Sequence, residues 1–442
     1  MNQSSQIYSP LMDRYNDPDI SKIWDHLNYC RLAVSHWRSE ALSFGVTFPM
    51  MQEKQLIDLS RRARVLEETT HHELVALLSA YEETLPPSQV WALHLGMTSS
   101  DVQDHVEKKL LYSSVRVIVS RLSGLVSVLS NAVHSWRDLP VLGRTHLQPA
   151  EPTTLGYRLS QHLEQLYEIM LLLNEVQDED RWARGAVGTL ANISLAMRQA
   201  RRLLRVDTEE ISTLAFGQTY PRTDDLRLMH LLSQLAAVLY KLAQDLRLMS
   251  MEPYVIKKQA PGAVGSSAMP GKVNPIGWEK VCGLTRLVPD MTSSIWHMAA
   301  GTMLERTLDD SSTRRMVLPQ VFMLLAHSLS TATTEMARLK IDPHEARKQV
   351  FDNWKSWLPS RYLAILQATR STGARSELHK RSEQAILSCS TIHEALQLIS
   401  AACSHVMEEG EVLSLGQASR LAFLVWERAN EAQDQVKEGN KR

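Results

Sequence analysis

The stretch between Pro221 and Pro253 constrains the fold most, because it contains no other proline and no glycine. Apolar residues recur in it at steps of three and four, which places them on one face of a helix: Leu228, Leu232, Leu235, Leu239, Leu242, Leu246 and Met249. Asp224 and Asp225 precede this run, as the positive end of a helix dipole favours. The pattern predicts one long helix.

Two further stretches, 106–136 and 154–176, have the same periodicity and no internal proline, and no obvious strand lies between the long helices. Long helices without strands predict an all-α helix bundle. The helix after Pro221 also has apolar residues off its main stripe, which indicates burial on more than one side. An oligomer that shares its bundle would provide this burial, and a large monomer with a central helix is the alternative.

Size and composition narrow the possible classes of protein. A chain of 442 residues exceeds what one core supports, so two or three domains are expected. A net charge of -1 and a pI near 7.0 provide no overall field for nucleic acid or membranes. The N-terminus does not have the pattern of a signal peptide, and no apolar run approaches a bilayer-spanning length. We therefore expect a cytoplasmic protein.

The four cysteines, Cys30, Cys282, Cys389 and Cys403, lie far apart in the chain. Their spacing matches no metal-binding pattern. We expect reduced, partly buried thiols, as in a cytosolic protein.

A glycine-rich segment, 261–277, contains two serines, a lysine and an asparagine. A loop of this composition can close over a substrate, and its backbone N–H groups can hold an oxyanion. It lacks the Gly-Lys-Ser/Thr ending of a phosphate-binding P-loop. From composition alone, a plain linker remains an alternative.

Three blocks of this chain resemble the fumarase/aspartase superfamily, whose members eliminate fumarate from succinyl compounds. Residues 265–275, Gly-Ser-Ser-Ala-Met-Pro-Gly-Lys-Val-Asn-Pro, are similar to its signature loop, and residues 94–104 and 143–154 are similar to two further blocks in the expected order. Within the superfamily, residues 304–315, which end in paired arginines, resemble the adenylosuccinate lyase family. The resemblance covers residues 10–320 and fades afterwards.

The resemblance implies a carbon–nitrogen lyase of purine biosynthesis that cleaves adenylosuccinate to AMP and fumarate by acid–base elimination. It also implies cleavage of the succinyl-carboxamide ribonucleotide, a small-molecule nucleotide substrate, no cofactor or metal, and no nucleic-acid or membrane partner. The implied fold has three helical domains: an N-terminal domain at 1–109, a central long-helix bundle with the signature loop at 110–341, and a C-terminal domain at 342–442. Four such chains would form a homotetramer whose active sites are shared between subunits.

Two residues are implied to carry the chemistry. Ser266 would be the general base, and His146 would protonate the leaving nitrogen, as histidine does near pH 7. A serine hydroxyl is a poor base until its pKa is lowered, which requires a dry, cationic, closed loop. Lys272 and Asn274 suit the stabilisation of the doubly charged intermediate. Glu279 would orient His146, and a solvated helix glutamate is the alternative.

Most implied substrate-binding residues lie in the matching blocks: Arg14, Tyr15, His71, His72, Glu73, His94, Thr98, Ser99, Thr145, Gln218 and Lys280. A phosphate site is expected at Arg306, Ser311 and Arg315, because arginine binds phosphate in a bidentate way. A salt-bridged helix terminus is the alternative, since Glu305, Asp309 and Asp310 are close in sequence. A metal site at His71 and His72 is disfavoured, because adjacent residues of a helix point to different sides.

The chain departs from the adenylosuccinate lyase pattern at three positions. Gly271 stands where a larger residue is usual, Glu73 replaces an aspartate, and Lys280 replaces an arginine whose planar fork lysine lacks. A related lyase that releases fumarate from a non-purine N-succinyl substrate, argininosuccinate or an N-substituted aspartate, is therefore an alternative. A structural tetramer without catalysis is another, and it predicts damage at Ser266, His146 or Lys272, all of which are present.

Overall fold

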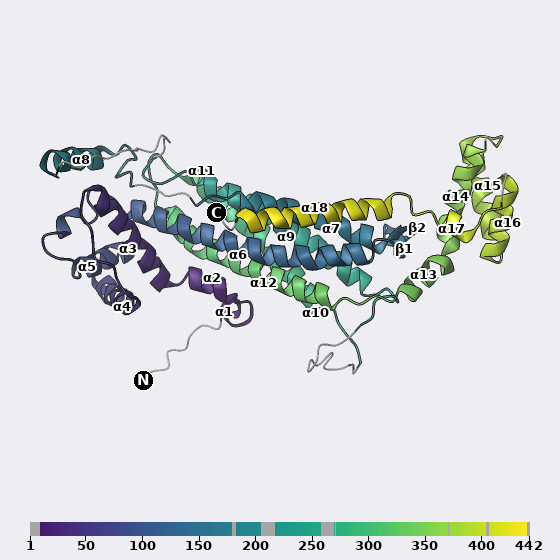
Figure 1. The fold of residues 1–442 in the computed structure, drawn as a ribbon, viewed down its shortest axis with the longest axis horizontal. Coiled ribbons are helices and arrows are strands. Elements are labelled where there is room, and N and C mark those ends of the chain that lie inside the picture. The colour runs from purple at the N-terminus through teal and green to yellow at the C-terminus, as the bar shows by residue number, and fades with distance from the viewer. Residues whose placement is uncertain are drawn as a thin grey trace. The chain divides into compact units, whose positions relative to one another are not determined.

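The structure is a computed structural model that describes residues 9–178, 183–204, 217–257, 269, 271–369, 371–403 and 406–439. It is built mainly from α-helices (Figure 1). Four of its long helices are α6 (Ser99–Ser135), α7 (Leu155–Asn174), α9 (Thr223–Met249) and α12 (Asp309–Arg338). The predicted all-α fold with a long-helix bundle is confirmed, and three of these helices coincide with the periodic stretches.

Two compact units divide the chain. Unit 1 comprises Met1–Leu122, Leu171–Tyr240 and Val281–Ser330, and unit 2 comprises Ser123–Met170, Lys241–Lys280 and Thr331–Arg442. The four long helices each contribute one part to either unit. Each unit is described separately below.

The apolar stripe of α9 explains why so long a helix forms. Leu232, Leu235 and Leu239 are fully buried on its main face, and Ala236 and Val238, off this face, are buried as well. Leu226 and Leu231, which also lie off the main stripe, are only half-buried, so burial on more than one side stays a prediction. By length and composition alone, α6 and α12 could also cross a membrane, but buried core helices pass the same test, and much of each apolar stretch is buried within the protein.

Unit 1 contains the N-terminal helices α1 (Pro10–Arg14), α2 (Pro18–Ile23), α3 (His26–Ser43), α4 (Glu53–Thr70) and α5 (Glu73–Glu82), the 3-10 turn η1 (Val90–Ala92), and also α8 (Ala191–Leu204) and α11 (Leu287–Gly301). Helices α3 to α5 pack on the start of α6 around a shared apolar core. Trp37 stacks on Tyr81 at 5.8 Å in its centre, and Phe48 meets the same tyrosine edge-on. This core fixes the start of α6, where the site begins.

Unit 2 contains a β-hairpin, the start of α10 (Ile276–Thr285), and the C-terminal helices α13 (Pro343–Asp352), α14 (Trp354–Ala368), α15 (Arg375–Ser388), α16 (Ile392–Ala402), α17 (Glu409–Val412) and α18 (Ala418–Gly439). Trp354 and Trp357 lie in the core of the C-terminal helices. Leu142 from the hairpin belongs to the same core, so the base of the hairpin is anchored by apolar burial.

The hairpin corrects the expectation that no strand lies between the long helices. Strand β1 (Pro140–Thr145) pairs antiparallel with β2 (Gln148–Thr154), and a bulge sets Gly143 opposite two residues of β2. A Cβ atom at Gly143 would lie 2.1 Å from the carbonyl oxygen of Glu151, so only glycine fits there. Because the strands are short and contain three prolines, Pro140, Pro149 and Pro152, their alternation is hidden in the sequence.

All four cysteines are free, as predicted. Cys30, Cys282 and Cys389 are buried, and Cys403 is partly buried. The thiols therefore act as small apolar side chains of the core.

Candidate active site

A cavity of about 750 Å³ in unit 1 collects most of the predicted substrate-binding residues. They come from four segments that are far apart in the sequence: His71, His72 and Glu73; Thr98 and Ser99; Gln218; and Arg306, Ser311 and Arg315. Ser100, Gln103, Ser312 and Glu67 add further polar groups to the lining. The motifs that were linked only by resemblance thus meet at one place in the fold.

Three helix N-termini meet at this cavity. His72 caps α5, Thr98 and Ser99 stand at the start of α6, and Ser311 lies in the first turn of α12. Unpaired backbone N–H groups and the helix dipole make such ends favourable for anions. With two arginines and two histidines in the same lining, the cavity suits a phosphate or carboxylate group.

The two histidines occupy the corner between α4 and α5. His71 ends α4 in a left-handed conformation with φ 51°, and His72 accepts a hydrogen bond from the Val75 N–H through Nδ1. They therefore do not follow one another on a helix, and the expectation that they point to different sides was wrong, because both line the cavity. With Nδ1 accepting, neutral His72 carries its proton on Nε2, where it can serve as a donor.

The start of α6 is fixed by the buried carboxylate of Asp101. It accepts hydrogen bonds from the Thr98 N–H (2.7 Å) and hydroxyl (2.9 Å), as an acidic side chain in the third position of a helix does when it bonds back to the N-cap residue. Its other bonds come from the backbone N–H groups of Arg184 (2.5 Å) and Gly185 (3.2 Å). Asp101 therefore ties the loop at Arg184 to the helix end that lines the cavity.

Gln218 is held by both ends of its amide. The Ser100 hydroxyl donates to Oε1 at 3.1 Å, and Nε2 donates to the Ala186 carbonyl at 3.0 Å. Its backbone N–H donates to the Glu305 carbonyl at 2.9 Å. The preceding Gly217 permits this approach, because a Cβ atom there would lie 2.6 Å from the same carbonyl oxygen.

Both predicted phosphate-binding arginines form ion pairs in this structure. Arg315 pairs with Glu73 (Nη2–Oε2, 2.6 Å), and its side chain is 47% exposed. Arg306 pairs with Asp310 (Nη1–Oδ1, 2.6 Å) and is mostly buried. The salt-bridged helix terminus considered from the sequence is thus present, and the same arginines still face the cavity.

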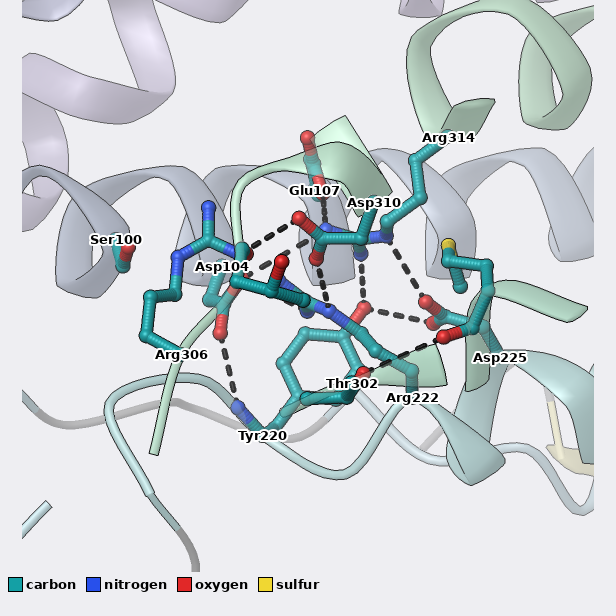
Figure 2. A network of polar contacts seen from close by, with 12 residues as sticks. Ser100, Asp104, Glu107, Tyr220, Arg222, Asp225, Thr302, Arg306, Asp310 and Arg314 are labelled. Atoms are coloured by element: carbon teal, nitrogen blue, oxygen red, sulfur yellow. Dashed lines mark hydrogen bonds and ion pairs between the residues drawn. The ribbon is translucent and has the colours of Figure 1, made fainter. Parts of the chain in front are cut away.

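A buried ionic network lies beside the cavity (Figure 2). Arg222 bridges Asp104 of α6 (2.9 Å) and Asp310 of α12 (2.8 Å). Arg314 pairs with Asp225 of α9 (3.0 Å) and with Glu107 of α6. The network joins three long helices and, through Asp310, also holds Arg306.

Tyr220 completes the network (Figure 2). Its backbone N–H donates to Asp104 at 3.0 Å, and its hydroxyl donates to Asp225 at 2.7 Å. Burial raises the pKa of Asp104 and of Glu107, although Arg222 and Arg314 oppose the shift. For Asp310 burial acts in the same direction, but Arg222 and Arg306 outweigh it and lower the pKa. The carboxylate that holds Arg306 is therefore kept ionised.

In and beside this network, only Arg306, Ser311 and Arg315 were predicted from the sequence to be functional. Arg222, Asp225 and Asp104 were missed, because an isolated arginine or aspartate carries no local pattern that marks it as buried. One feature of the sequence could have indicated the network. Residues 304–315 contain acidic and basic residues at a density that is too high for a solvated helix face alone.

Three predicted residues of unit 1 lie outside the cavity lining. The His94 Nδ1 accepts a hydrogen bond from the Trp37 indole at 3.1 Å, and burial lowers the pKa of His94 to about 4. Tyr15 packs edge-on against His327 at 5.6 Å, and Arg14 ends α1. The partly buried position of His94 and its bond to Trp37 favour a packing role for this side chain.

The remaining predicted residues belong to unit 2. Thr145 and His146 are exposed at the tip of the hairpin, and Thr145 also lines a cavity of about 690 Å³. Lys272 and Asn274 precede α10, whose first turns carry Lys280 and Glu279, and Glu279 lies 3.9 Å from the Arg247 guanidinium. Within the described part of the chain, no hydrogen bond or ion pair joins Glu279 to His146, and Ser266 lies outside the described residues.

The chain is similar to known lyases. A profile of the lyase family matches residues 54–289. Adenylosuccinate lyase from Schistosoma mansoni is 31% identical over 368 residues, which cover 78% of this chain and 75% of that protein. Adenylosuccinate lyase from Saccharomyces cerevisiae is 28% identical over 398 residues, which cover 84% of this chain and 81% of that protein.

Solved structures with the same fold include other enzymes of this group. The 3-carboxy-cis,cis-muconate lactonizing enzyme from Pseudomonas putida superposes with a TM-score of 0.76 at 23% identity, and covers 96% of this chain and 100% of that chain. A fumarate lyase from Mesorhizobium superposes with a TM-score of 0.73 at 19% identity, over 93% and 98% of the two chains. The family match over more than half of the chain and the 31% identity to a full-length relative together show that this chain belongs to the lyase family of the fumarase/aspartase superfamily.

Proposed function

We propose that this chain is a carbon–nitrogen lyase of purine biosynthesis that cleaves adenylosuccinate to AMP and fumarate. The observation that carries the substrate assignment is the cavity of unit 1, where Arg306, Arg315 and Ser311 meet three helix N-termini. Its curated relatives over most of the chain are adenylosuccinate lyases. Cleavage of the succinyl-carboxamide ribonucleotide is part of the same proposal.

The unit 1 cavity supports binding of the nucleotide phosphate. Arg306 and Arg315 provide planar donors, and the Ser311 hydroxyl provides a further hydrogen bond at the start of α12. A substrate without phosphate would not require this cluster of two arginines and a serine. The phosphate therefore favours adenylosuccinate over argininosuccinate or an N-substituted aspartate.

The chemistry is a β-elimination that consumes no water. A base removes a proton from the carbon adjacent to the one that carries the nitrogen. The C–N bond breaks, the two carbons form the double bond of fumarate, and an acid protonates the nitrogen that leaves with AMP. We assign the base to Ser266 and the acid to His146, with Lys272 and Asn274 stabilising the doubly charged intermediate. His146 is exposed at the hairpin tip, as a group that must meet a substrate requires.

The departures from the adenylosuccinate lyase pattern have local physical explanations. Gly271 adopts φ 87°, a conformation in which a larger residue would be strained. Glu73 uses its extra methylene group to reach Arg315. Neither feature alters the proposed reaction, and nothing in the structure explains Lys280, the third departure.

The complete site is proposed to form in a homotetramer in the cytoplasm. Binding residues gather in unit 1, whereas His146, Lys272 and Asn274 belong to unit 2. Large apolar side chains of unit 1 are exposed, including Trp296, Met303, Leu304, Met316 and Leu308, the last of which lines the cavity. Exposed apolar groups of this size favour contact with another subunit. The division into three domains at 1–109, 110–341 and 342–442 belongs to the same proposal.

The assignment is tested by incubating the purified protein with adenylosuccinate and measuring AMP and fumarate. Equal amounts of both products are expected, with strong losses in Ser266→Ala and His146→Ala. Argininosuccinate serves as the parallel substrate. Fumarate from argininosuccinate without AMP from adenylosuccinate would overturn the purine assignment, and no fumarate from either would favour a structural tetramer.

A further inference from the structure

The hairpin tip in unit 2 holds two residues in an unfavourable conformation. Thr145 pairs with Gln148, so His146 and Leu147 form a two-residue loop. Their φ angles are 53° and 64°, as at the central positions of a type I′ turn, which Asn and Gly normally occupy. Left-handed conformations at histidine and leucine persist only where their surroundings enforce them. The surroundings of this turn are therefore informative.

One ion pair lies directly beside the turn. Arg144 binds Glu252 through two bonds, from Nε to Oε1 (2.6 Å) and from Nη2 to Oε2 (3.2 Å). The remaining Nη1 of Arg144 donates to the Leu147 carbonyl at 3.4 Å, which contacts the turn itself. Glu252 is mostly buried and also accepts a hydrogen bond from Gln349 of α13. The guanidinium is thus fixed on one side and reaches the turn on the other.

A second contact restrains the base of the hairpin from the same segment. Arg158 donates to the Leu142 carbonyl (2.7 Å) and to the Tyr254 hydroxyl (3.0 Å). Tyr254 accepts at its carbonyl from the Asp342 N–H at 2.8 Å, so the segment 252–254 is itself anchored. Tip and base of the hairpin are therefore attached to one fixed segment.

We propose that the Arg144–Glu252 pair is a positioning device that holds the His146–Leu147 turn in its left-handed conformation and so aims the His146 imidazole at the substrate. This inference rests on the proposed role of His146 as the acid. Proton transfer requires hydrogen-bond distance to the departing nitrogen, so a loosened turn costs rate. Arg144 and Glu252 act through His146 and do not touch the substrate in this proposal.

The first test uses Glu252→Gln in the full-length protein, which keeps the size of the side chain and removes its charge. We expect kcat to fall about tenfold or more while KM changes less than about threefold, since positioning affects the transition state. Arg144→Lys keeps the charge but loses the fork, and should show a smaller loss of kcat. Leu147→Asn, which tolerates the left-handed region, should restore part of kcat in the Glu252→Gln background.

A matched control is Asp245→Asn. Asp245 lines the cavity of about 690 Å³ that Arg144 and Glu252 also line, and it pairs with His162 (2.9 Å) and Lys241, neither of which belongs to the hairpin. We expect its kcat to be unchanged. An equal loss of kcat in Asp245→Asn would overturn the proposal, because the loss of any carboxylate charge in this cavity would then lower kcat.

Hydrogen–deuterium exchange tests the positioning independently of catalysis. Faster exchange in residues 141–152 is expected in Glu252→Gln, with no change in Asp245→Asn. Unchanged exchange together with wild-type kcat would overturn the inference. A fully active His146→Ala would instead overturn the proposed function, and exchange would still show whether the pair holds the turn.

Discussion

The cavity of unit 1 and the hairpin tip of unit 2 contain different kinds of polar group. Beside the cavity, buried charged side chains form more than one ion pair each, as Arg222 does with Asp104 and Asp310. At the tip, His146 is exposed and its backbone is strained. The difference supports the proposals that the binding side is built for rigidity and that the proposed acid depends on the pair of Arg144 with Glu252 for its position.

The largest expected effect concerns the hairpin tip. Replacing His146 by alanine removes the proposed acid, so kcat should fall by about 10²- to 10⁴-fold. The melting temperature should change little, because the side chain is exposed. Steady-state kinetics and thermal unfolding check the two halves of this prediction. A large loss of stability would show that the tip is structural as well.

The next effect concerns the buried network of unit 1. Arg314→Met leaves Asp225 and Glu107 as buried carboxylates without their partner. We expect the free energy of unfolding to drop by about 3–5 kcal/mol, as for other broken buried pairs. Denaturant unfolding measures it, with Arg428→Gln as the control for an exposed pair. Equal stability of the two variants would contradict the rigid role of the network.

A smaller effect is expected at the cavity wall. Glu73→Gln removes the charge that engages Arg315, so the half-exposed guanidinium becomes available to an anion. Because exposed pairs are weak, inhibition by inorganic phosphate should strengthen only about two- to fivefold. Inhibition constants measure the change, and Glu73→Asp, which keeps the charge, is the control. Weaker inhibition in Glu73→Gln would mean that Arg315 does not bind phosphate.

The last expected effect is that the free energy of unfolding of unit 1 depends on pH. Burial raises the pKa of Glu40 to about 7, although the Ala183 N–H opposes the shift. Protonated Glu40 therefore favours the folded state, and its contribution is full below the usual glutamate pKa and is lost as pH rises through 7. Glu40→Gln should remove this loss, and unfolding measured at pH 5 and pH 8 shows it. A pH difference that persists unchanged in Glu40→Gln would assign it to other groups.

Much of the fold followed from the sequence, because long helices leave a periodic pattern. The stripe from Leu232 to Leu246 specified α9 without any tertiary information. The hairpin did not follow, because its strands are short and the strained turn at Leu147 lacks the Asn-Gly signature of such loops.

The site was predictable to a different degree in each unit. Motifs identified the residues that line the unit 1 cavity, from His72 to Arg315. The spacing of these motifs along the sequence does not give the distances between them in space. The pairs Glu73–Arg315 and Arg144–Glu252 depend on side-chain reach between remote segments, and no local pattern encodes it. The hydrogen bond of His94 with Trp37 likewise became visible only in the fold, and the substrate contact of His94 stays a prediction.

The most direct test of the proposed division between binding and chemistry is complementation. Arg306→Ala lacks a binding group of unit 1, and His146→Ala lacks the proposed acid of unit 2. Each variant alone should be nearly inactive at substrate concentrations well below KM. The two are mixed under mild denaturing conditions that allow subunit exchange, with wild-type protein treated in parallel. Activity of the mixture well above the sum of both variants is the predicted result, and activity no higher than that sum would contradict sites shared between subunits.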